Sequence, residues 1–254
     1  MLSRLKIRLE KEANLSYQMG SLFQGALMEL LSEELGELLH RPERHAYAQH
    51  LEYSDGRWYW VITTMAEELR RGIILEGLML RSSISIKKNE MEIKFEEKQL
   101  MELPLEQLSR RMYEGDASRY LQLSFLTPTA FKINGSYVFH PDVRAMYISL
   151  MNRYAAMDPT QDMRDEDALE ELVKATQIVR YNLKSTRFFL ESTSVPSFVG
   201  SLTLRFGGTQ TMCRFADFLF HVGEYSGIGI KTSMGMGAIR LIENGADRND
   251  RHTN

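Results

Sequence analysis

The order in which its hydrophobic patterns alternate constrains the fold of this chain more than any other feature. Residues 5–9 place leucine or isoleucine at every second position between charged residues, which predicts a half-buried strand. From residue 16 to residue 39 the apolar spacing changes to three and four, which predicts a long amphipathic helix, or two helices joined near Gly36. The chain therefore begins with a strand followed by a helical region.

The next segments complete a recognisable order of elements. Strands are expected at Tyr47–Tyr53 and Trp58–Thr64, because they flank Ser54-Asp55-Gly56, a turn sequence typical of a hairpin. A short helix at Ala66–Arg71 and a strand at Ile73–Ile86 follow. Strand, helix, strand, strand, helix, strand is the ferredoxin-like order, which RNA-recognition modules also use.

The second half of the chain repeats this order after a connector. Residues 91–114 form the expected connector, a charged stretch for which an extended conformation is one option, followed by a helix over Leu105–Tyr113. The later elements are expected to be the strands Tyr120–Leu126, Val179–Leu190, Phe198–Phe206 and Ala238–Ile242 and the helices Pro141–Ala156, Glu166–Thr176 and Gln210–Gly223. We therefore predict an α+β protein with two tandem ferredoxin-like βαββαβ domains, residues 1–115 and 116–243, and a disordered tail, 244–254.

Composition narrows the class of protein. With 43% hydrophobic and 26% charged residues, the chain can form a globular core. The single cysteine, Cys213, forms no internal disulfide, and no apolar run reaches the roughly 18 residues that cross a bilayer. We expect a reduced cytoplasmic protein. The net charge of −3 disfavours a nucleic-acid partner, but residues 174–240 hold eight basic and three acidic residues, which permits RNA binding and equally fits a solvated face.

A glycine-rich segment near the C-terminus is the most specific local feature. Four glycines surround Lys231-Thr232-Ser233, at Gly227, Gly229, Gly235 and Gly237. Glycine permits positive φ and close approach of backbone N–H groups to an anion. The spacing is neither that of a P-loop nor that of a dinucleotide fingerprint, and the segment precedes a strand. The alternatives at this point are a phosphate-contacting loop with Lys231 as its cation and a tight structural loop.

The run Gly-Ile-Gly-Ile-Lys-Thr-Ser-Met-Gly-Met-Gly over 227–237 closely resembles the C-terminal signature of the CRISPR-associated endoribonucleases that cut repeat RNA, especially type III-associated members. Other segments resemble that family in the same order: Ser124–Lys132, Phe198–Phe206, and Leu38-Leu-His40 followed by Ala46–Leu51. The resemblance covers nearly the whole chain. It implies tandem ferredoxin-like domains and cleavage of precursor CRISPR RNA.

The chemistry that this resemblance implies uses neither metal nor cofactor. The ribose 2′-OH attacks the adjacent phosphate, a base accepts its proton, an acid protonates the leaving 5′-oxygen, and cations stabilise the phosphorane. A 2′,3′-cyclic phosphate and a 5′-OH result, and DNA is no substrate because it has no 2′-OH. The mature guide RNA would serve antiviral defence, with a multisubunit interference complex as a transient partner. The alternatives are a family member that binds repeat RNA without cutting it and a nucleotide-binding regulator.

His40 matches the catalytic histidine of the family, although a helix-terminal histidine is also favoured by the helix dipole alone. His45 is a candidate acid, and Arg44 a candidate cation for the phosphorane. Many members carry a tyrosine in the first helix where this chain has Met28, so the partner of His40 stays open. The expected RNA-binding residues are Lys231, Gly227, Gly229, Thr232, Ser233, Gly235, Gly237, Lys132 and Arg205.

Overall fold

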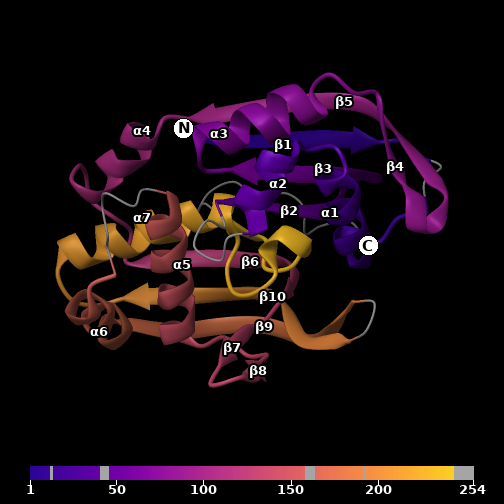
Figure 1. Cartoon of the computed structure of the whole chain (residues 1–254). Coiled ribbons are helices and arrows are strands. Elements are labelled where there is room, and N and C mark those ends of the chain that lie inside the picture. Colours follow the sequence, from indigo (N-terminus) through magenta and orange to yellow (C-terminus); the bar gives the residue numbers. More distant parts are fainter. Residues whose placement is uncertain (12–13, 41–45, 158–163, 191–192, 243–254) are drawn as a thin grey trace.

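The computed structural model describes residues 1–11, 14–40, 46–157, 164–190 and 193–242. Two large antiparallel sheets lie one above the other, the first built from strands within residues 2–103 and the second from strands within residues 120–242 (Figure 1). No helix in this described part of the chain is long and apolar enough to cross a membrane. The predicted α+β class with two ferredoxin-like domains in tandem is confirmed.

The first sheet has the strand order β2-β3-β1-β5-β4. Strands β2 and β3 form the predicted hairpin, and its turn residues Asp55 and Gly56 both have positive φ, 53° and 72°, as a two-residue hairpin turn requires. The first four strands in this order give the ferredoxin-like arrangement, and β4 adds an edge. The strand bounds are β1 Leu2–Leu9, β2 Tyr47–Ser54, β3 Arg57–Thr64, β4 Ser83–Ile86 and β5 Met91–Leu103.

Helices cover one face of the first sheet. The helical region after β1 begins with Ser16, whose side chain caps a 3₁₀ turn. Phe23 and Trp60 meet edge to face at 5.0 Å between the helices and the sheet. The elements are the 3₁₀ turn η1 Tyr17–Met19, α1 Gly20–Met28, α2 Glu33–His40, α3 Glu67–Leu69 and the π-helix η2 Arg70–Leu78. The two helices were expected to join near Gly36, but the break falls at residues 29–32 and Gly36 lies inside α2.

Two predictions for the first half were wrong. Residues 73–86 do not form one strand, because 70–78 form the π-helix and only Ser83–Ile86 is extended. Ile73, Ile74 and Leu78 are all buried under the sheet, and a short apolar run does not distinguish a buried helix from a strand. Residues 91–103 are not a connector but strand β5, paired with both β1 and β4. Charged residues occupy both faces of β5, so its pattern did not reveal it.

The second sheet has the order β11-β6-β10-β9, again the ferredoxin-like arrangement. The strands and helices predicted for this half are confirmed, with shifted ends. The strand bounds are β6 Tyr120–Thr129, β9 Thr176–Phe189, β10 Ser194–Phe206, β11 Ile239–Ile242 and the small hairpin β7 Phe131–Ile133 with β8 Ser136–Val138. The helices are α4 Leu105–Ser109, α5 Val143–Met157, α6 Glu166–Ala175 and α7 Gln210–Ser226; the 3₁₀ turns are η3 Lys87–Asn89, η4 Arg110–Met112 and η5 Thr232–Met234.

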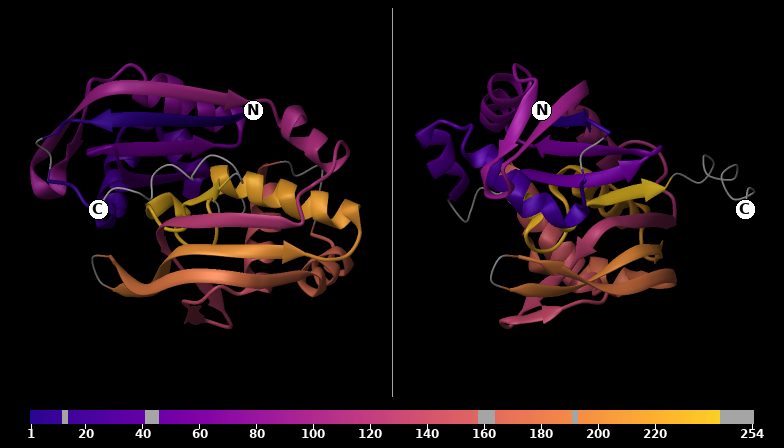
Figure 2. Two further views of the ribbon diagram at one scale, coloured as in Figure 1. Left: turned by 180° about the vertical axis from the view of Figure 1, so that it is seen from behind. Right: turned by 90° about the vertical axis from the view of Figure 1, so that its right-hand side faces the viewer.

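Helix α7 connects the two halves. It lies between the two sheets when the molecule is seen from the front and from behind (Figures 1 and 2). Its C-terminal end packs on the first sheet, where Arg4 donates to the carbonyl of Glu224 at 2.8 Å and Thr63 donates to the carbonyl of Tyr225. The Arg4 guanidinium also lies over the Tyr225 ring, 4.7 Å from its centre. The two domains are therefore joined by specific polar contacts.

Candidate functional site

The glycine-rich loop, residues 227–237, is closed by hydrogen bonds within the protein. The N–H groups of three of its glycines have internal acceptors: Gly227 donates to Gly223, Gly229 to the Ser149 hydroxyl and Gly237 to Pro128. All three have positive φ, which glycine adopts without strain. These glycines therefore shape the loop, and their N–H groups are not available to a phosphate.

The centre of the loop packs against the first domain. Thr232 is buried, and its methyl group fills the space between Gly227 and Gly237. Ser233 presents its carbonyl to β2, where the Gln49 amide donates to it at 2.8 Å. Gly235 lies against Gly20, the first residue of α1, so closely that a Cβ on Gly235 would be 3.0 Å from the Gly20 Cα. Of the predicted loop residues, these three serve packing.

Lys231 is the cation of the loop and is partly exposed. Its backbone is left-handed, with φ 56°, an uncommon conformation for a residue with a side chain. Its ammonium group lies 4.0 Å from the Met234 sulfur and makes no ion pair with any residue that the structure describes. Behind the loop, burial lowers the pKa of Arg153 to about 10, so this guanidinium remains charged at neutral pH while it donates to the Gly229 carbonyl.

The two other predicted RNA-binding cations lie in different places. Lys132, on β7, lines a cavity of about 210 Å³ together with Gly229 and Ile230, so it lies near the loop. Arg205 pairs with Tyr120, at the start of β6, whereas the loop bonds to Pro128 near its end. Eight residues of strand separate these points, about 27 Å at roughly 3.4 Å per residue. The structure therefore places Lys132 beside the start of the loop and leaves Arg205 at the far end of the sheet.

The predicted catalytic residues follow the first helices. His40 is the last residue of α2, and Arg44 and His45 lie outside the described residues. Met28, which stands where many members of the resembling family have tyrosine, is the last residue of α1 and is partly buried against the core. It offers a thioether and no proton. Glu33 and Glu34 in the first turn of α2 suit the positive end of that helix.

The second sheet has an open face, on the side away from α5 and α7, that carries cations without acids. None of β6, β9, β10 and β11 contains an aspartate or a glutamate. Arg180, Lys184 and Arg205 are exposed and form no ion pair within the described part of the chain. Tyr120 on β6 pairs with Arg205, so it lies on the same face, and it is 50% exposed. Unpaired cations beside exposed aromatic rings suit a single-stranded nucleic acid, because phosphates pair with the cations and bases stack on the rings.

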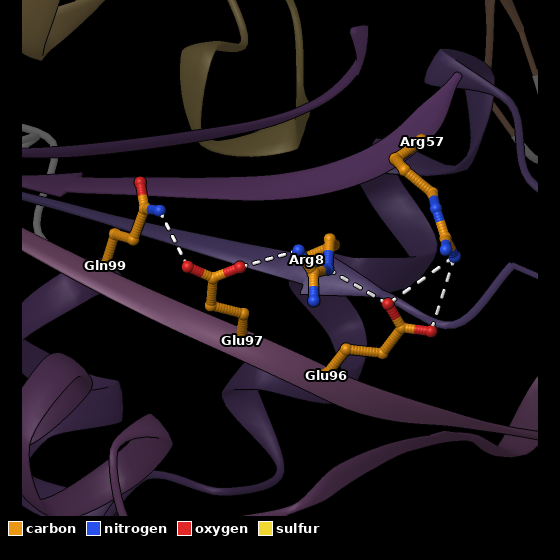
Figure 3. Close-up of polar contacts among 5 residues, drawn as sticks. All are labelled: Arg8, Arg57, Glu96, Glu97 and Gln99. Carbon is orange, nitrogen blue, oxygen red and sulfur yellow. Dashed lines mark hydrogen bonds and ion pairs between the residues drawn. The ribbon is translucent and has the colours of Figure 1, made fainter. Parts of the chain in front are cut away.

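The corresponding open face of the first sheet is neutralised by its own acids. Arg8 pairs with Glu97 at 2.7 Å and with Glu96 at 3.0 Å, and Arg57 reaches Glu96 at 3.4 Å. Figure 3 shows these side chains in one chain of contacts that ends at Gln99, which donates to Glu97 at 2.9 Å. Each guanidinium here already has a carboxylate, so this face offers less to a phosphate than the open face of the second sheet.

An ionic cluster joins the edges of the two sheets. Glu52 on β2 accepts from Lys6 at 2.7 Å and from Arg240 on β11 at 2.8 Å. Burial would raise the pKa of the Glu52 carboxyl, but contacts with His50 and Lys6 and the charge of Arg240 outweigh it, and the pKa lies below its usual range. Burial lowers the pKa of His50, whose buried Nε2 lies 3.6 Å from Glu52, too far for a good hydrogen bond.

Two glutamines that sequence reasoning missed connect the domains. Gln18 in η1 donates to the Arg187 carbonyl at 2.8 Å and accepts from the Phe189 N–H at 2.8 Å, so its amide caps the edge of β9. Gln49 joins β2 to the glycine-rich loop. Neither glutamine lies in a recognisable sequence motif, and their hydrogen-bond partners are up to 184 positions away in the sequence. The exposed cations of β9 lay within the basic segment seen in the sequence, but only the strand register places Arg180 and Lys184 on one face.

Comparisons with known proteins agree with the fold and with the glycine-rich signature. A family described as "CRISPR-associated endoribonuclease Cas6" matches residues 123–239. The CRISPR-associated endoribonuclease Cas6 of Streptococcus thermophilus is 30% identical over 222 residues, 87% of this chain and 90% of that protein. The protein of the same name from Mycobacterium tuberculosis, strain CDC 1551 / Oshkosh, is 33% identical over 252 residues, 94% of this chain and 78% of that protein.

A solved structure supports the same fold. A Cas6 product complex superposes with a TM-score of 0.79 at 21% identity, covering 95% of this chain and 99% of that one. At this identity the likeness concerns the fold, and the family rests on the sequence matches. The family expected from the glycine-rich segment and its companions is thereby confirmed: the chain belongs to the Cas6 family of CRISPR-associated endoribonucleases.

Proposed function

We propose that the protein is a metal-independent endoribonuclease that cuts precursor CRISPR RNA within its repeat. The observation that carries the proposal is the position of His40 at the end of α2 in a chain of this family. Histidine exchanges protons near neutral pH, which suits a proton transfer at the cut phosphodiester. The site needs no cofactor for this reaction.

The proposed RNA path crosses the open face of the second sheet. Arg180 and Lys184 on β9 are exposed and have no acid beside them on that sheet, so phosphate is their natural partner. Tyr120 on β6, which pairs with Arg205 on this face, offers a ring to a base. From β9 the path leads to the glycine-rich loop, where Lys231 and Lys132 contact further phosphates. Arg205 serves the opposite end of the same face.

In the proposed mechanism, the 2′-OH of the nucleotide before the cut attacks the adjacent phosphorus. His40 takes the proton from this hydroxyl, or gives one to the 5′-oxygen when the P–O5′ bond breaks. His45 supplies the second proton-transfer group, and Arg44 places a permanent charge beside the phosphorane. The products are a 2′,3′-cyclic phosphate on the upstream RNA and a 5′-OH on the downstream RNA. No water enters this step.

One cleavage assay tests the proposal. Labelled repeat RNA is incubated with the protein in EDTA, beside the same RNA carrying a 2′-deoxy nucleotide immediately before the cut. We expect cleavage of the first RNA only, with a cyclic phosphate at the new end, because the deoxy RNA has lost the attacking group. Cleavage of both RNAs, or a complete loss of cleavage in EDTA that added metal restores, would contradict the mechanism.

One observation favours a second candidate function, a repeat-RNA-binding protein that does not cut. Met28 stands where many members have tyrosine, and it cannot donate or accept a proton. In the same assay this alternative predicts that both RNAs are bound and neither is cut. The two candidates share the RNA path and differ only in the chemistry at the end of α2.

The expected partners follow from the reaction. The repeat RNA binds as substrate, and the guide RNA passes to a multisubunit CRISPR interference complex in the cytoplasm, with which the protein associates transiently. DNA of the same sequence would not be a substrate, because its missing 2′-OH removes the nucleophile. Incubation of labelled DNA of the repeat sequence with the protein, beside the repeat RNA, measures this: the RNA should be cut and the DNA should stay intact.

A further inference from the structure

Gln49 is a buried amide in which every hydrogen-bonding group has a partner. Its Nε2 donates to the Gly20 carbonyl at 2.7 Å and to the Ser233 carbonyl at 2.8 Å, and its Oε1 accepts from the Trp60 indole at 2.8 Å. Gly20 is the first residue of α1, Ser233 lies in η5 of the glycine-rich loop, and Trp60 lies in the core. One side chain thus ties two segments of different domains to the first sheet.

Only glutamine satisfies this arrangement at this position. Two donors and one acceptor are needed, and the side-chain amide provides both from one planar group. Glutamate has nearly the same shape but donates nothing, so it would face two carbonyl oxygens with a negative charge. Leucine would leave both carbonyls and the indole N–H without partners in a buried place. The contact therefore depends on the chemistry of the amide and not on its volume.

Gly20 provides the space for this contact. Its backbone is ordinary right-handed helix, with φ −53° and ψ −38°, so the conformation itself does not require glycine. A Cβ on Gly20 would lie 2.4 Å from the Met234 carbonyl oxygen and 2.9 Å from the Gly235 Cα. The backbones of the loop and of α1 are in direct contact, with no space for a side chain at Gly20. Figure 1 shows this loop beside the first helices.

We propose that Gln49 is a positioning residue that holds the glycine-rich loop against the start of α1, and so fixes Lys231 relative to the helical segment that ends at His40. The inference rests on the proposed function, in which Lys231 contacts a phosphate and His40 transfers a proton. Lys231 is two residues before Ser233, and α1 continues through a four-residue turn into α2. The clamp therefore sets where the bound phosphate lies when the chemistry occurs.

The test compares Gln49→Glu with Lys231→Ala, using repeat RNA with a 2′-deoxy nucleotide for affinity and all-ribose repeat RNA for single-turnover cleavage. Lys231→Ala should weaken affinity roughly tenfold and lower the slope of log K against log salt by about 0.7–0.9, as loss of one phosphate contact does. Gln49→Glu should reproduce both effects although it leaves Lys231 in place. It should also slow cleavage at saturating RNA about 10- to 100-fold, because reacting groups are misplaced.

The double variant separates positioning from a general loss of stability. If Gln49 acts through Lys231, Gln49→Glu combined with Lys231→Ala should bind no more weakly than either single variant. Independent effects would multiply to about a hundredfold loss. Multiplying losses, or a Gln49→Glu variant with the affinity, salt slope and cleavage rate of the wild-type protein, would overturn the proposal. Failure of the wild-type protein to bind repeat RNA would instead remove the proposed function, and the positioning role with it.

Two further variants keep the test sharp. Gly20→Ala displaces the loop through its added methyl group while the Gln49 amide stays intact, so it should give the same pattern even if Gln49→Glu folds poorly. Thr63→Val is the matched control: it removes hydrogen bonds from the Thr63 hydroxyl to the Tyr225 and Ala48 carbonyls, close to the loop, and leaves all three hydrogen bonds of the Gln49 amide in place. It should keep the salt slope and cleave within about twofold of wild type. If Thr63→Val lowers the salt slope as Gln49→Glu does, then any weakened contact between the two domains displaces Lys231. That result would overturn the specific role of Gln49.

Discussion

The two sheets have the same strand arrangement and opposite electrostatic designs. On the open face of the first sheet, Arg8 and Arg57 are paired with Glu96 and Glu97. On the open face of the second sheet, the strands carry no acid at all. Of two domains with the same strand arrangement, one thus has an open face on which Arg8 and Arg57 are paired with carboxylates, and the other has an open face on which Arg180, Lys184 and Arg205 have no carboxylate partner among the described residues. In the proposed function, the RNA would bind the second domain, and the first domain would contribute His40 at the end of α2.

Removal of the proposed catalytic group should have the largest effect and tests this division of labour. His40→Ala should reduce single-turnover cleavage of repeat RNA by about 10²- to 10⁴-fold, because one proton transfer loses its group. Affinity for the 2′-deoxy repeat RNA should stay within about twofold, since the RNA is held elsewhere. Unchanged cleavage removes His40 from the site, and a large loss of affinity means that the first domain also binds the RNA.

Neutralising the second face should weaken binding by roughly 10- to 100-fold at low salt. Arg180→Gln with Lys184→Gln removes two unpaired cations, so the slope of log K against log salt should fall by about 1.5. The matched double variant Arg8→Gln and Arg57→Gln removes two cations from the first face, where carboxylates already hold them. It should leave the slope unchanged. Equal losses in filter-binding titrations with the two double variants would erase the electrostatic distinction between the sheets.

The sequence predicted the fold well where apolar spacing followed burial and failed where it did not. Alternating apolar and charged residues predicted strand β1, and the turn residues Asp55 and Gly56 predicted the hairpin. Strand β5 does not alternate, because charged residues occupy both of its faces and its register with β1 shifts opposite residues 95–97, so its sequence predicted a connector. The π-helix at 70–78 contains only a short apolar run, and the periodicity of such a run fits a buried strand as well as a buried helix.

The candidate site was predictable in part. The glycine-rich segment identified the family, and His40 was found only through that resemblance, because a single histidine at a helix end has no distinctive spacing. The sequence left open whether the glycines contact a phosphate or shape a tight loop, and in the structure the N–H groups of Gly227, Gly229 and Gly237 close the loop. Gln49 could not be found from sequence, since its bonds to Gly20 and Ser233 exist only after two domains have packed together.

In the first domain, the buried pair His50 and Glu52 should make the stability of the fold depend on pH. Burial keeps His50 neutral in the folded protein, with a lowered pKa, while the unfolded chain takes up the proton below about pH 6.5. Stability should therefore fall as pH decreases from about 6.5, at no more than about 1.4 kcal/mol per pH unit for this proton. Protonation of Glu52, whose folded pKa is also lowered, should add a further loss below the usual carboxyl range, under about pH 4.5.

Urea unfolding between pH 5 and pH 8 measures the contribution of His50. His50→Gln should flatten the dependence of the unfolding free energy on pH below about 6.5, because the buried imidazole that takes up a proton on unfolding is then absent. His140→Gln, at an exposed position on the second domain, controls for the loss of a histidine. A wild-type curve that is flat from pH 8 to pH 5, or that is unchanged by His50→Gln, would contradict a neutral buried imidazole.

The smallest expected effect comes from removing the acids of the first sheet, which makes its open face resemble that of the second sheet. Glu96→Gln with Glu97→Gln frees the guanidinium groups of Arg8 and Arg57. These pairs are about one-third exposed, so their loss should lower the free energy of unfolding by less than about 1 kcal/mol. Affinity for repeat RNA should rise about two- to fivefold at low salt, with a steeper salt slope. If affinity does not rise, the first face lies out of reach of the RNA, and the geometry of the domains, rather than the acids of β5, decides which sheet binds it.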